Sequence, residues 1–308
     1  MPKNFPVHGN VPAIVTPFDA AGEIRYGDFA QLVRWHLGNG VDGICVAGDN
    51  GESWTLSLDE RRRLAETAVQ IAAKKVPVVM GASGISAKQS IAYAEVAAAA
   101  GVDALMIGPQ AYVMKATTKE LVQRMQTIHR AVPLPIVLYN SPRRTNISLT
   151  IDAMRAITEA VNVIGLKEAS REFFYVSHVI HHFADKLAVL IGPAPFIIPG
   201  IQLGAAGFIS SGPELFDGVA SKLMGIAGKP LTPELRTLHY RLTRIYETLM
   251  SLGTWPAALK AGHALIGQPG GVPRDPVLPL GEADIATLSA VMTEVGIAHS
   301  GKRAAAAE

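Results

Sequence analysis

The sequence contains a single cysteine, Cys45, among 308 residues. One thiol excludes an internal disulfide and any metal site built from several cysteines. Because Cys45 lies in the apolar run Gly-Ile-Cys-Val-Ala-Gly (43–48), we expect it to be a small buried hydrophobic residue. We also expect neither a metal nor a cofactor. His178, His181 and His182 fall close together, but no pattern of carboxylates accompanies them.

Charge of one sign is not in excess. The 28 Lys and Arg residues stand against 26 Asp and Glu residues, which leaves a formal net charge of +2. This balance gives no basic surface for nucleic acid or for an anionic membrane, so we expect neither as a partner. The N-terminal segment contains no apolar signal core, and we therefore expect a cytoplasmic protein.

Charged residues are missing from one long stretch, residues 187–213, which is long enough on paper to span a bilayer. Prolines and glycines interrupt this stretch repeatedly, and the broken backbone hydrogen bonds would be unsatisfied in lipid. We therefore predict two buried strands around a short helix, and no membrane segment.

Short apolar runs recur along the chain, most of them bounded by Gly or Pro. They do not alternate with polar residues, which is typical of strands buried on both faces of a parallel sheet. The runs are 13–15, 44–46, 78–80, 105–107, 136–138, 163–166, 189–191 and 208–209.

Amphipathic helical patterns lie between these runs, at 27–39, 58–74, 87–100, 118–131, 149–159, 172–183, 195–203 and 214–224. Ser57 begins a capping box with Glu60, and Ser86 opens a helix that ends at Gly101. Unbroken strand–helix units predict an α/β fold, a (β/α)8 TIM barrel rather than an open doubly wound sheet. No G-x-G-x-x-G motif follows the first run, which weakens the dinucleotide-binding alternative.

From Pro233 onward the pattern is helical only, at 233–251, 256–267 and 282–298, with a Pro/Gly-rich connection at 268–281. We predict a catalytic barrel over residues 1–226, a C-terminal helical domain over 227–300 and a disordered tail over 301–308.

The most informative position is Lys167, which ends the apolar run 163–166 and precedes a polar loop. An ammonium at the end of a buried strand is costly to desolvate unless it is paired. The same burial lowers the pKa of a lysine, which frees the amine as a nucleophile toward a carbonyl carbon. The alternative is that the chain leaves the core here and Lys167 points to water.

Barrel enzymes carry their chemistry at the carboxyl ends of the strands. Tyr139 follows the fifth run and Lys167 follows the sixth, so both should face one cavity. A phenol beside a nucleophilic amine can shuttle the protons of carbinolamine formation. The alternative is that Tyr139 is an ordinary aromatic cap on the barrel.

Polar residues follow two other strands. The turn at 48–52 contains Asp49 and Asn50 between two glycines, and the backbone N–H groups of this turn can hold a carboxylate. The alternative is a plain connection between strand and helix, in which Asn50 is present because asparagine favours turns. Arg143 and Arg144 follow the fifth strand. Each guanidinium can clamp a carboxylate bidentately or be a solvated loop charge.

Taken together, these motifs resemble the dihydrodipicolinate synthase / N-acetylneuraminate lyase family of Schiff-base enzymes over nearly the whole chain. The matching segments are Ala-Ile-Val-Thr-Pro-Phe (13–18), Gly-x-x-Gly-Glu (48–52), Tyr-Asn-x-Pro (139–142), Gly-Leu-Lys-Glu-Ala-Ser (165–170) and Gly-Phe-Ile-Ser (207–210).

The resemblance implies a (β/α)8 barrel with a C-terminal helical extension, assembled as a homotetramer. It implies that Lys167 forms an imine with a 2-oxo acid, most often pyruvate, and that Tyr139 transfers protons. Arg144 matches the arginine that binds substrate carboxylate, and Ile209 matches a residue that contributes its backbone carbonyl. Tyr112 is near, but offset from, the tyrosine that the synthases lend to a neighbouring subunit's site.

The chain departs from the family at two places. Most relatives have two hydroxyl residues where this chain has Asp49 and Asn50, which we count among the substrate-binding residues. The family's polar segment after the seventh strand is here Gly-Pro-Ala-Pro-Phe (192–196). Segment 192–196 of this chain has no side-chain hydrogen-bonding groups, which favours short or compact cyclic 2-oxo acids as substrates over polyhydroxylated sugar acids.

We therefore expect a Schiff-base-forming lyase or aldolase that acts on a small 2-oxo acid through Lys167. The alternatives are a dehydratase or deaminase of a related 2-oxo or cyclic imine acid, dihydrodipicolinate synthase proper, or a barrel that binds 2-oxo acids without turnover.

Overall fold

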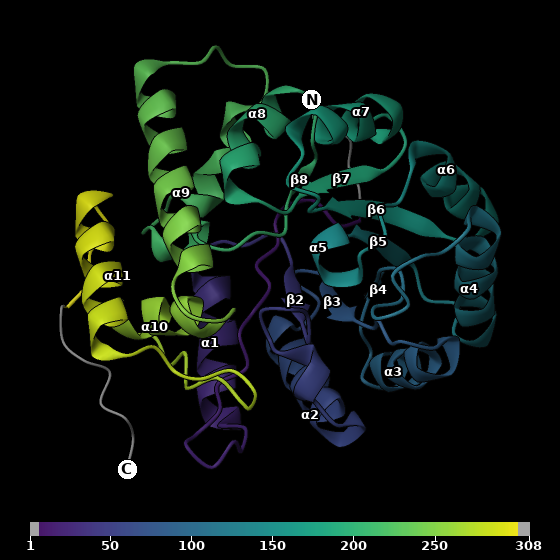
Figure 1. The fold of residues 1–308 in the computed structure, drawn as a ribbon, viewed down its shortest axis with the longest axis horizontal. Helices are drawn as coiled ribbons and strands as arrows, with labels where there is room; N and C mark the ends of the chain where they lie inside the picture. Colours follow the sequence, from purple (N-terminus) through teal and green to yellow (C-terminus); the bar gives the residue numbers. More distant parts are fainter. Residues whose placement is uncertain (1–5, 301–308) are drawn as a thin grey trace.

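A parallel sheet of eight strands curls into a (β/α)8 TIM barrel in the computed structural model, which describes residues 6–300 (Figure 1). The order of the strands is β1-β8-β7-β6-β5-β4-β3-β2. The predicted fold class is confirmed, whereas the predicted tail at 301–308 lies outside the described residues. The strands are β1 (Gly9–Asn10), β2 (Ile44–Val46), β3 (Val78–Gly81), β4 (Ala104–Ile107), β5 (Ile136–Asn140), β6 (Val163–Glu168), β7 (Ala188–Ile191) and β8 (Gly207–Phe208).

The first strand differs from the prediction, which placed it at 13–15. Instead, β1 pairs with β8, and Ala13 bridges to Cys45 of β2 a few residues later. The N–H of Ile14 donates to the carbonyl of Cys45 at 2.9 Å. The apolar run 13–15 is buried, as predicted. The segment pairs first with β8 and then with β2, and this change of partner closes the barrel.

Helices surround the sheet (Figure 1). The α-helices are α1 (Tyr26–Gly38), α2 (Leu58–Ala72), α3 (Ala87–Ala99), α4 (Thr118–Ala131), α5 (Pro142–Thr145), α6 (Ile151–Ala160), α7 (Phe173–Phe183), α8 (Ile197–Gln202), α9 (Pro233–Ser251), α10 (Ala257–Leu265) and α11 (Glu282–Glu294). Short 3₁₀ helices are η1 (Ser53–Thr55), η2 (Ala194–Phe196), η3 (Pro213–Leu215) and η4 (Ala220–Ile226).

The helix start signals behave as the sequence predicts. Ser57 and Glu60 form a reciprocal capping box at α2, and the Ser86 side chain accepts from the N–H of Gln89 at the start of α3. Gly101 follows α3 with φ +78°, a conformation that glycine adopts without strain. The predicted helix at 214–224 is wrong, because η3 and η4 replace it, separated by a bend in which Gly218 has φ +62°.

The core has two layers. Small or medium side chains fill the inside of the barrel, among them Ala13, Cys45, Ala104 and Ala188. A larger apolar cluster lies between the sheet and the helices. Cys45 has no exposed surface, so the prediction that it is a buried hydrophobic residue is confirmed.

The uncharged stretch 187–213 forms β7, α8 and β8, as predicted. Within residues 6–300, no helix has the length and apolar character needed to cross a membrane.

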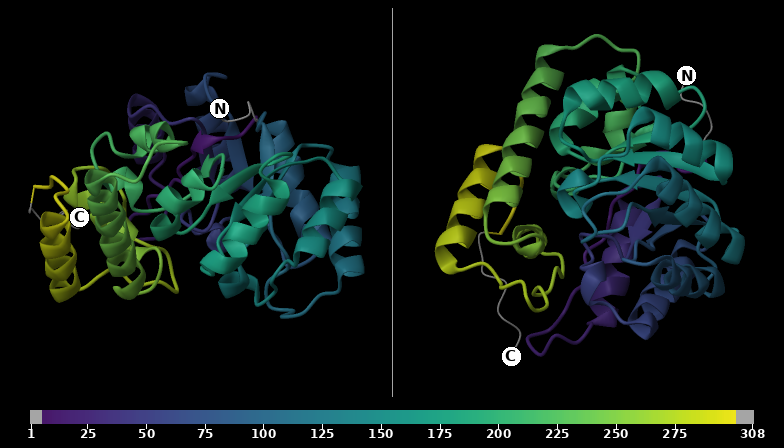
Figure 2. Two further views of the ribbon diagram at one scale, coloured as in Figure 1. Left: turned by 90° about the horizontal axis from the view of Figure 1, so that it is seen from above. Right: turned by 45° about the vertical axis from the view of Figure 1, so that its right-hand side comes forward.

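The last three helices, α9, α10 and α11, pack on one another and stand beside the barrel (Figure 2). Two ion pairs join this part of the chain to the barrel, one at the turn after β2 and one at α2. Lys260 of α10 pairs with Glu52, both with almost no exposed surface, and Arg274 pairs with Glu60 at 2.6 Å. The division of the chain at residue 226 stays a prediction.

Candidate active site

Lys167 and Tyr139 lie side by side at the carboxyl ends of β6 and β5. They are direct partners in the register of the two parallel strands, so their side chains share one face of the sheet. The amine of Lys167 lies 4.5 Å from the centre of the Tyr139 ring. Lys167 is 7% exposed, which excludes the alternative that this side chain points to water.

The ends of these two strands are held by a buried polar network on the other face. The Asn140 amide donates to Oε2 of Glu168 at 2.8 Å, and the N–H of Ser170 donates to Oε1 at 2.6 Å. Burial raises the pKa of Glu168, and these hydrogen bonds partly oppose the increase. Because Asn140 and Glu168 follow Tyr139 and Lys167 directly, the network fixes the direction of both functional side chains.

The carboxylate of Asp49 interacts with both Tyr139 and Arg144. The phenol of Tyr139 donates to Oδ2 of Asp49 at 2.9 Å, and Nε of Arg144 donates to the same oxygen at 3.2 Å. Burial, and then the charge of Asp49, raise the pKa of Tyr139 well above its usual value. Burial lowers the pKa of Lys167 although Asp49 opposes the shift. The phenol therefore stays protonated at neutral pH, while the amine loses its proton more readily than an exposed lysine.

Hydrogen bonds within the turn that carries Asp49 hold its shape. The N–H groups of Gly51 and Glu52 donate to carbonyls within the turn, so these two groups do not form the carboxylate-binding nest expected there. Asn50 uses its amide nitrogen for the carbonyl of Ala13 and the hydroxyl of Ser211, both at 2.8 Å. Asn50 thus ties three barrel segments together, and its donors are committed within the protein.

A cavity of about 380 Å³ opens at this end of the barrel. It brings together every predicted site residue except Tyr112. Those residues are Asp49, Asn50, Tyr139, Arg144, Lys167 and Ile209. Ile209 is 1% exposed and donates its N–H to the carbonyl of Ile191 at 3.0 Å. Whether these residues carry the predicted roles stays a prediction.

The far wall of the cavity is not the one that the sequence suggests. Only Gly192 of the segment 192–196 lines it, while Ala194 is buried and the Phe196 ring packs on Phe173 at 5.1 Å. Residues that the strand ends did not indicate take that place: Arg171 after β6, and Tyr246, Met250, Gly253, Thr254 and Trp255 from α9 and the turn behind it.

Tyr112 lies apart from this cavity. Its side chain is 87% exposed, in the loop after β4, where the backbone has φ +70°. A role at a neighbouring subunit's site would require such exposure, and this role stays a prediction.

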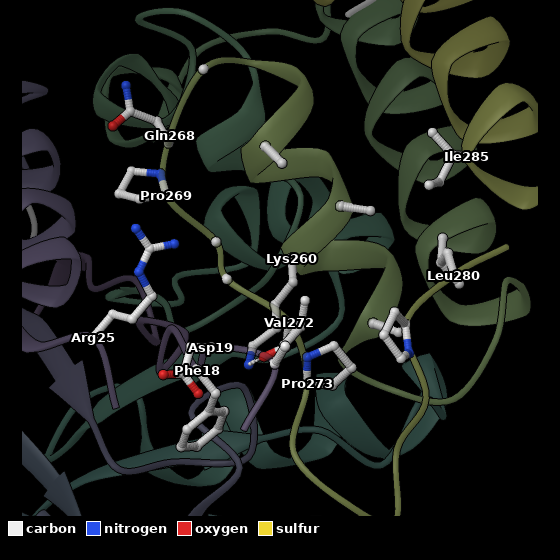
Figure 3. A pocket seen from close by; sticks show the side chains of 18 of the residues that line it. Phe18, Asp19, Arg25, Lys260, Gln268, Pro269, Val272, Pro273, Leu280 and Ile285 are labelled. Carbon is white, nitrogen blue, oxygen red and sulfur yellow. Dashed lines mark hydrogen bonds between the residues drawn. The ribbon is translucent and has the colours of Figure 1, made fainter. Parts of the chain in front are cut away.

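A second cavity, of about 980 Å³, lies between the loop after the first strand segment, α10 and the connection before α11 (Figure 3). Lys260 extends into it, but the amine is paired with Glu52 and donates to the carbonyl of Val272 at 2.7 Å. Burial lowers the pKa of Lys260 to about 8, against the opposing charge of Glu52. The committed amine makes this larger cavity a poorer reaction site than the one around Lys167.

Groups able to hold a metal ion, with three or more His, Cys, Asp or Glu side chains, do not occur within residues 6–300. His178, His181 and His182 lie on α7 at the outside of the barrel, with ring contacts between neighbours.

Comparison with known proteins gives one consistent result. Residues 6–295 match the dihydrodipicolinate synthetase family. The 4-hydroxy-tetrahydrodipicolinate synthase of Neisseria gonorrhoeae is 32% identical over 296 residues, which cover 94% of this chain and 99% of the relative.

Solved structures agree. A chloride-inhibited dihydrodipicolinate synthase from Acinetobacter baumannii, complexed with pyruvate, superposes with a TM-score of 0.88 at 28% identity, covering 95% of this chain and all of that one. CdNal from Clostridium difficile, in complex with mannosamine, has a TM-score of 0.85 at 21% identity over 94% and 99% of the two chains. This second likeness shows the fold alone.

Proposed function

The chain belongs to the dihydrodipicolinate synthetase family, and on that premise we propose that it is a Schiff-base-forming lyase or aldolase that binds a small 2-oxo acid covalently through Lys167. The observation that carries the proposal is the buried amine of Lys167, with its lowered pKa, beside the protonated phenol of Tyr139. A free amine attacks carbonyl carbon, and a nearby phenol supplies the proton that the departing oxygen needs.

The proposed reaction begins with attack of the Lys167 amine on the 2-oxo carbon. The carbinolamine oxygen takes a proton from the phenol of Tyr139 and leaves as water, which forms a cationic iminium. The iminium stabilises an electron pair on the neighbouring carbon as an enamine. In a lyase reaction the bond from that carbon to a carbinol fragment breaks, and the fragment leaves as an aldehyde after its hydroxyl proton passes to the phenolate of Tyr139. In a dehydration the phenolate takes a proton from that carbon, and a hydroxyl on the next carbon leaves as water with this proton. Asp49, which accepts the phenol's hydrogen bond at 2.9 Å, orients Tyr139 and favours the positive charge.

Asp49 argues against efficient synthesis of dihydrodipicolinate. In the synthases a hydroxyl at this place both accepts and donates a hydrogen bond, whereas an ionised carboxylate only accepts. The charge also opposes a substrate carboxylate by roughly 1–4 kcal/mol at about 4 Å, depending on the local dielectric. Arg144 offsets part of this charge. These features support a lyase, dehydratase or deaminase, in which Asp49 serves as a base for water or stabilises the iminium.

Borohydride trapping tests the central step. Incubation with pyruvate and borohydride should add the reduced pyruvate to one lysine, and peptide mapping should place the adduct on Lys167. Lys167→Ala and Lys167→Arg should both abolish it, since a guanidinium stays protonated and cannot attack. Lys186→Ala, which removes an exposed lysine, is the matched control. An adduct on Lys260, which is also buried and also has a lowered pKa, would overturn the proposal.

Two turnover assays separate the remaining functions. With pyruvate and aspartate semialdehyde, we expect kcat/KM well below the ~10⁴ M⁻¹s⁻¹ at the lower end of ordinary enzymes. A value at or above that level would identify a synthase. A screen of 2-oxo acids should yield at least one substrate that is both trapped and turned over. Trapping without turnover of any substrate would favour a binding protein instead.

A further inference from the structure

Two arginines stand at the mouth of the Lys167 cavity, beyond Asp49 and Arg144. Arg143 lies in α5, and Arg171 lies in the loop after β6, four residues beyond Lys167. The guanidinium of Arg171 lies 5.1 Å from the centre of the Tyr246 ring, which comes from α9. Three separate elements therefore build this part of the wall.

The two guanidinium groups repel each other. Partial burial lowers the pKa of Arg143, and the charge of Arg171 lowers it further. Among residues 6–300, no carboxylate lies within ion-pair distance of either group. Among all the residues that line the cavity, Asp49 is the single acid, and it is already bound to Arg144. The site thus carries positive charge that the described part of the chain does not neutralise.

The backbone of Arg171 adds a second observation. Its φ is +66°, in the left-handed region where a side chain with a Cβ is strained and glycine is not. Glycine here would remove both the strain and the like-charge repulsion. The side chain that is present instead directs a guanidinium into the cavity, where Tyr246 supports it by a cation–π contact.

We infer that Arg143 and Arg171 form a second anion site, so that the natural substrate is a 2-oxo acid with a further carboxylate or other acid group at its distal end. This inference rests on the proposed imine chemistry, which holds the 2-oxo end at Lys167. Arginine is suited to the role because its planar fork binds a carboxylate bidentately.

The wild-type test compares two ligands of similar length, 2-oxoglutarate and 2-oxohexanoate, which differ in the terminal carboxylate. Trapping at graded concentrations gives the half-saturating concentration for each ligand. We expect 2-oxoglutarate to saturate at a concentration at least tenfold lower. Equal values for the two ligands would overturn the inference.

Variants of Arg143 and Arg171 test whether these two residues cause the preference for 2-oxoglutarate. Arg171→Gly suits the left-handed backbone, so the protein should fold, and together with Arg143→Gln it should reduce the 2-oxoglutarate preference by about tenfold or more. Arg130→Gln removes an exposed arginine of α4 and should change nothing. An unchanged preference in the Arg171→Gly/Arg143→Gln variant would contradict the assignment.

A pyruvate arm separates this inference from the proposed function. Pyruvate has no distal acid group, so the variants should raise its half-saturating concentration far less than that of 2-oxoglutarate. If the wild type traps neither pyruvate nor 2-oxoglutarate, the proposed function fails. Titration calorimetry of the unmodified protein with the same two ligands then decides the anion site, because this measurement requires no imine. Selective binding of 2-oxoglutarate would support it, and equal binding would refute it.

Discussion

At the residue scale, the reactivity of the site depends on how Asp49 divides its influence between two neighbours. Its charge raises the pKa of Tyr139 in the same direction as burial does, but it opposes burial at Lys167. The phenol therefore keeps its proton and can donate it. The pKa of the amine is set by two opposing effects, because desolvation lowers it and the charge of Asp49 raises it. Removing a single charge should shift both groups in one direction.

Tyr139→Phe tests proton transfer. The ring that packs beside Lys167 stays, so folding should be unaffected, and only the hydroxyl bonded to Asp49 is lost. General acid–base help contributes ~10²–10⁴-fold, and kcat should fall by about that range. Steady-state kinetics on the best substrate from the screen measures the effect. Near-normal kcat in this variant would refute the assigned role.

Asp49→Asn tests the electrostatic argument through pH. Because the carboxylate raises the pKa of Lys167, its removal should lower that pKa further. Only the free amine attacks, so the rate of imine formation rises with pH through this pKa, and the rise should move to lower pH in the variant. The trapping rate with pyruvate, measured from acidic to alkaline pH, gives the midpoint. Asp152→Asn, on the exposed face of α6, is the control, and equal midpoints in Asp49→Asn and wild type would count against the argument.

The residues that directly follow strands are the ones that the sequence predicts. Lys167, Tyr139 and Asp49 were predictable because parallel strands deliver their ends to one edge, whatever the packing of the helices. Tyr246 and Trp255 were not, because they belong to α9 and the turn behind it, and no local pattern says which loop a distant helix will cover. The role of Arg171 depends on this packing and on a backbone angle, and neither is visible in the sequence.

At the scale of elements, hydrophobic runs predicted burial better than pairing. The run at 13–15 is buried as expected, yet β1 begins earlier, because the segment pairs first with β8 and then with β2. Helix starts were more predictable, since a capping box is a local interaction. Pairing of strands far apart in the chain is decided by closure of the barrel as a whole.

Ser57→Ala tests the capping box of α2. The Ser57 hydroxyl accepts from the N–H of Glu60 at 3.2 Å, and its loss should lower the free energy of unfolding by ~1 kcal/mol. Glu60 keeps its ion pair with Arg274, so the effect should stay local. Denaturant titration gives the difference. Ser289→Ala, inside α11, should not destabilise the protein, and a similar loss in both variants would contradict the capping explanation.

At the scale of the whole molecule, the helical part completes the site rather than merely adjoining the barrel. It contributes Tyr246 and Trp255 to the cavity, and Lys260 to the buried pair with Glu52, three residues from Asp49. The carboxylate of Glu52 also accepts from the N–H of Arg274 at 2.9 Å. The position of the Asp49 turn therefore depends on residues more than two hundred positions away.

Glu52→Gln tests this dependence. The ammonium of Lys260 would stay buried without its carboxylate, and breaking such a pair costs about 3–5 kcal/mol. Unfolding monitored by heat or urea should show the loss, and the trapping rate should fall because the Asp49 turn loosens. Adding Lys260→Met removes the stranded charge and should restore part of the stability. Glu66→Gln, in the exposed pair with Arg62, is the control, and equal effects of Glu52→Gln and Glu66→Gln would reject the argument.

Assembly into a homotetramer would place the exposed loop after β4 at a contact between subunits. Tyr112, Val113 and Met114 form an exposed, largely apolar loop beside the barrel mouth, as a contact between subunits would require. We expect size-exclusion chromatography with light scattering to give a homotetramer, four times the chain mass of 32.6 kDa. Tyr112→Ala should slow imine formation if the tyrosine reaches a neighbour's site. A monomer in solution would contradict the prediction.

The single thiol inside the barrel has a practical consequence. Cys45 has no exposed surface, and burial raises the pKa of its thiol to about 11, so reagents cannot reach it while the strands are closed. The rate at which a thiol reagent labels Cys45 under native conditions therefore measures the rate at which the barrel opens. The labelling rate can also be measured in variants that destabilise the helical part, such as Glu52→Gln. An unchanged rate would show that the helical part unfolds independently, and a faster rate would show that the barrel unfolds together with it.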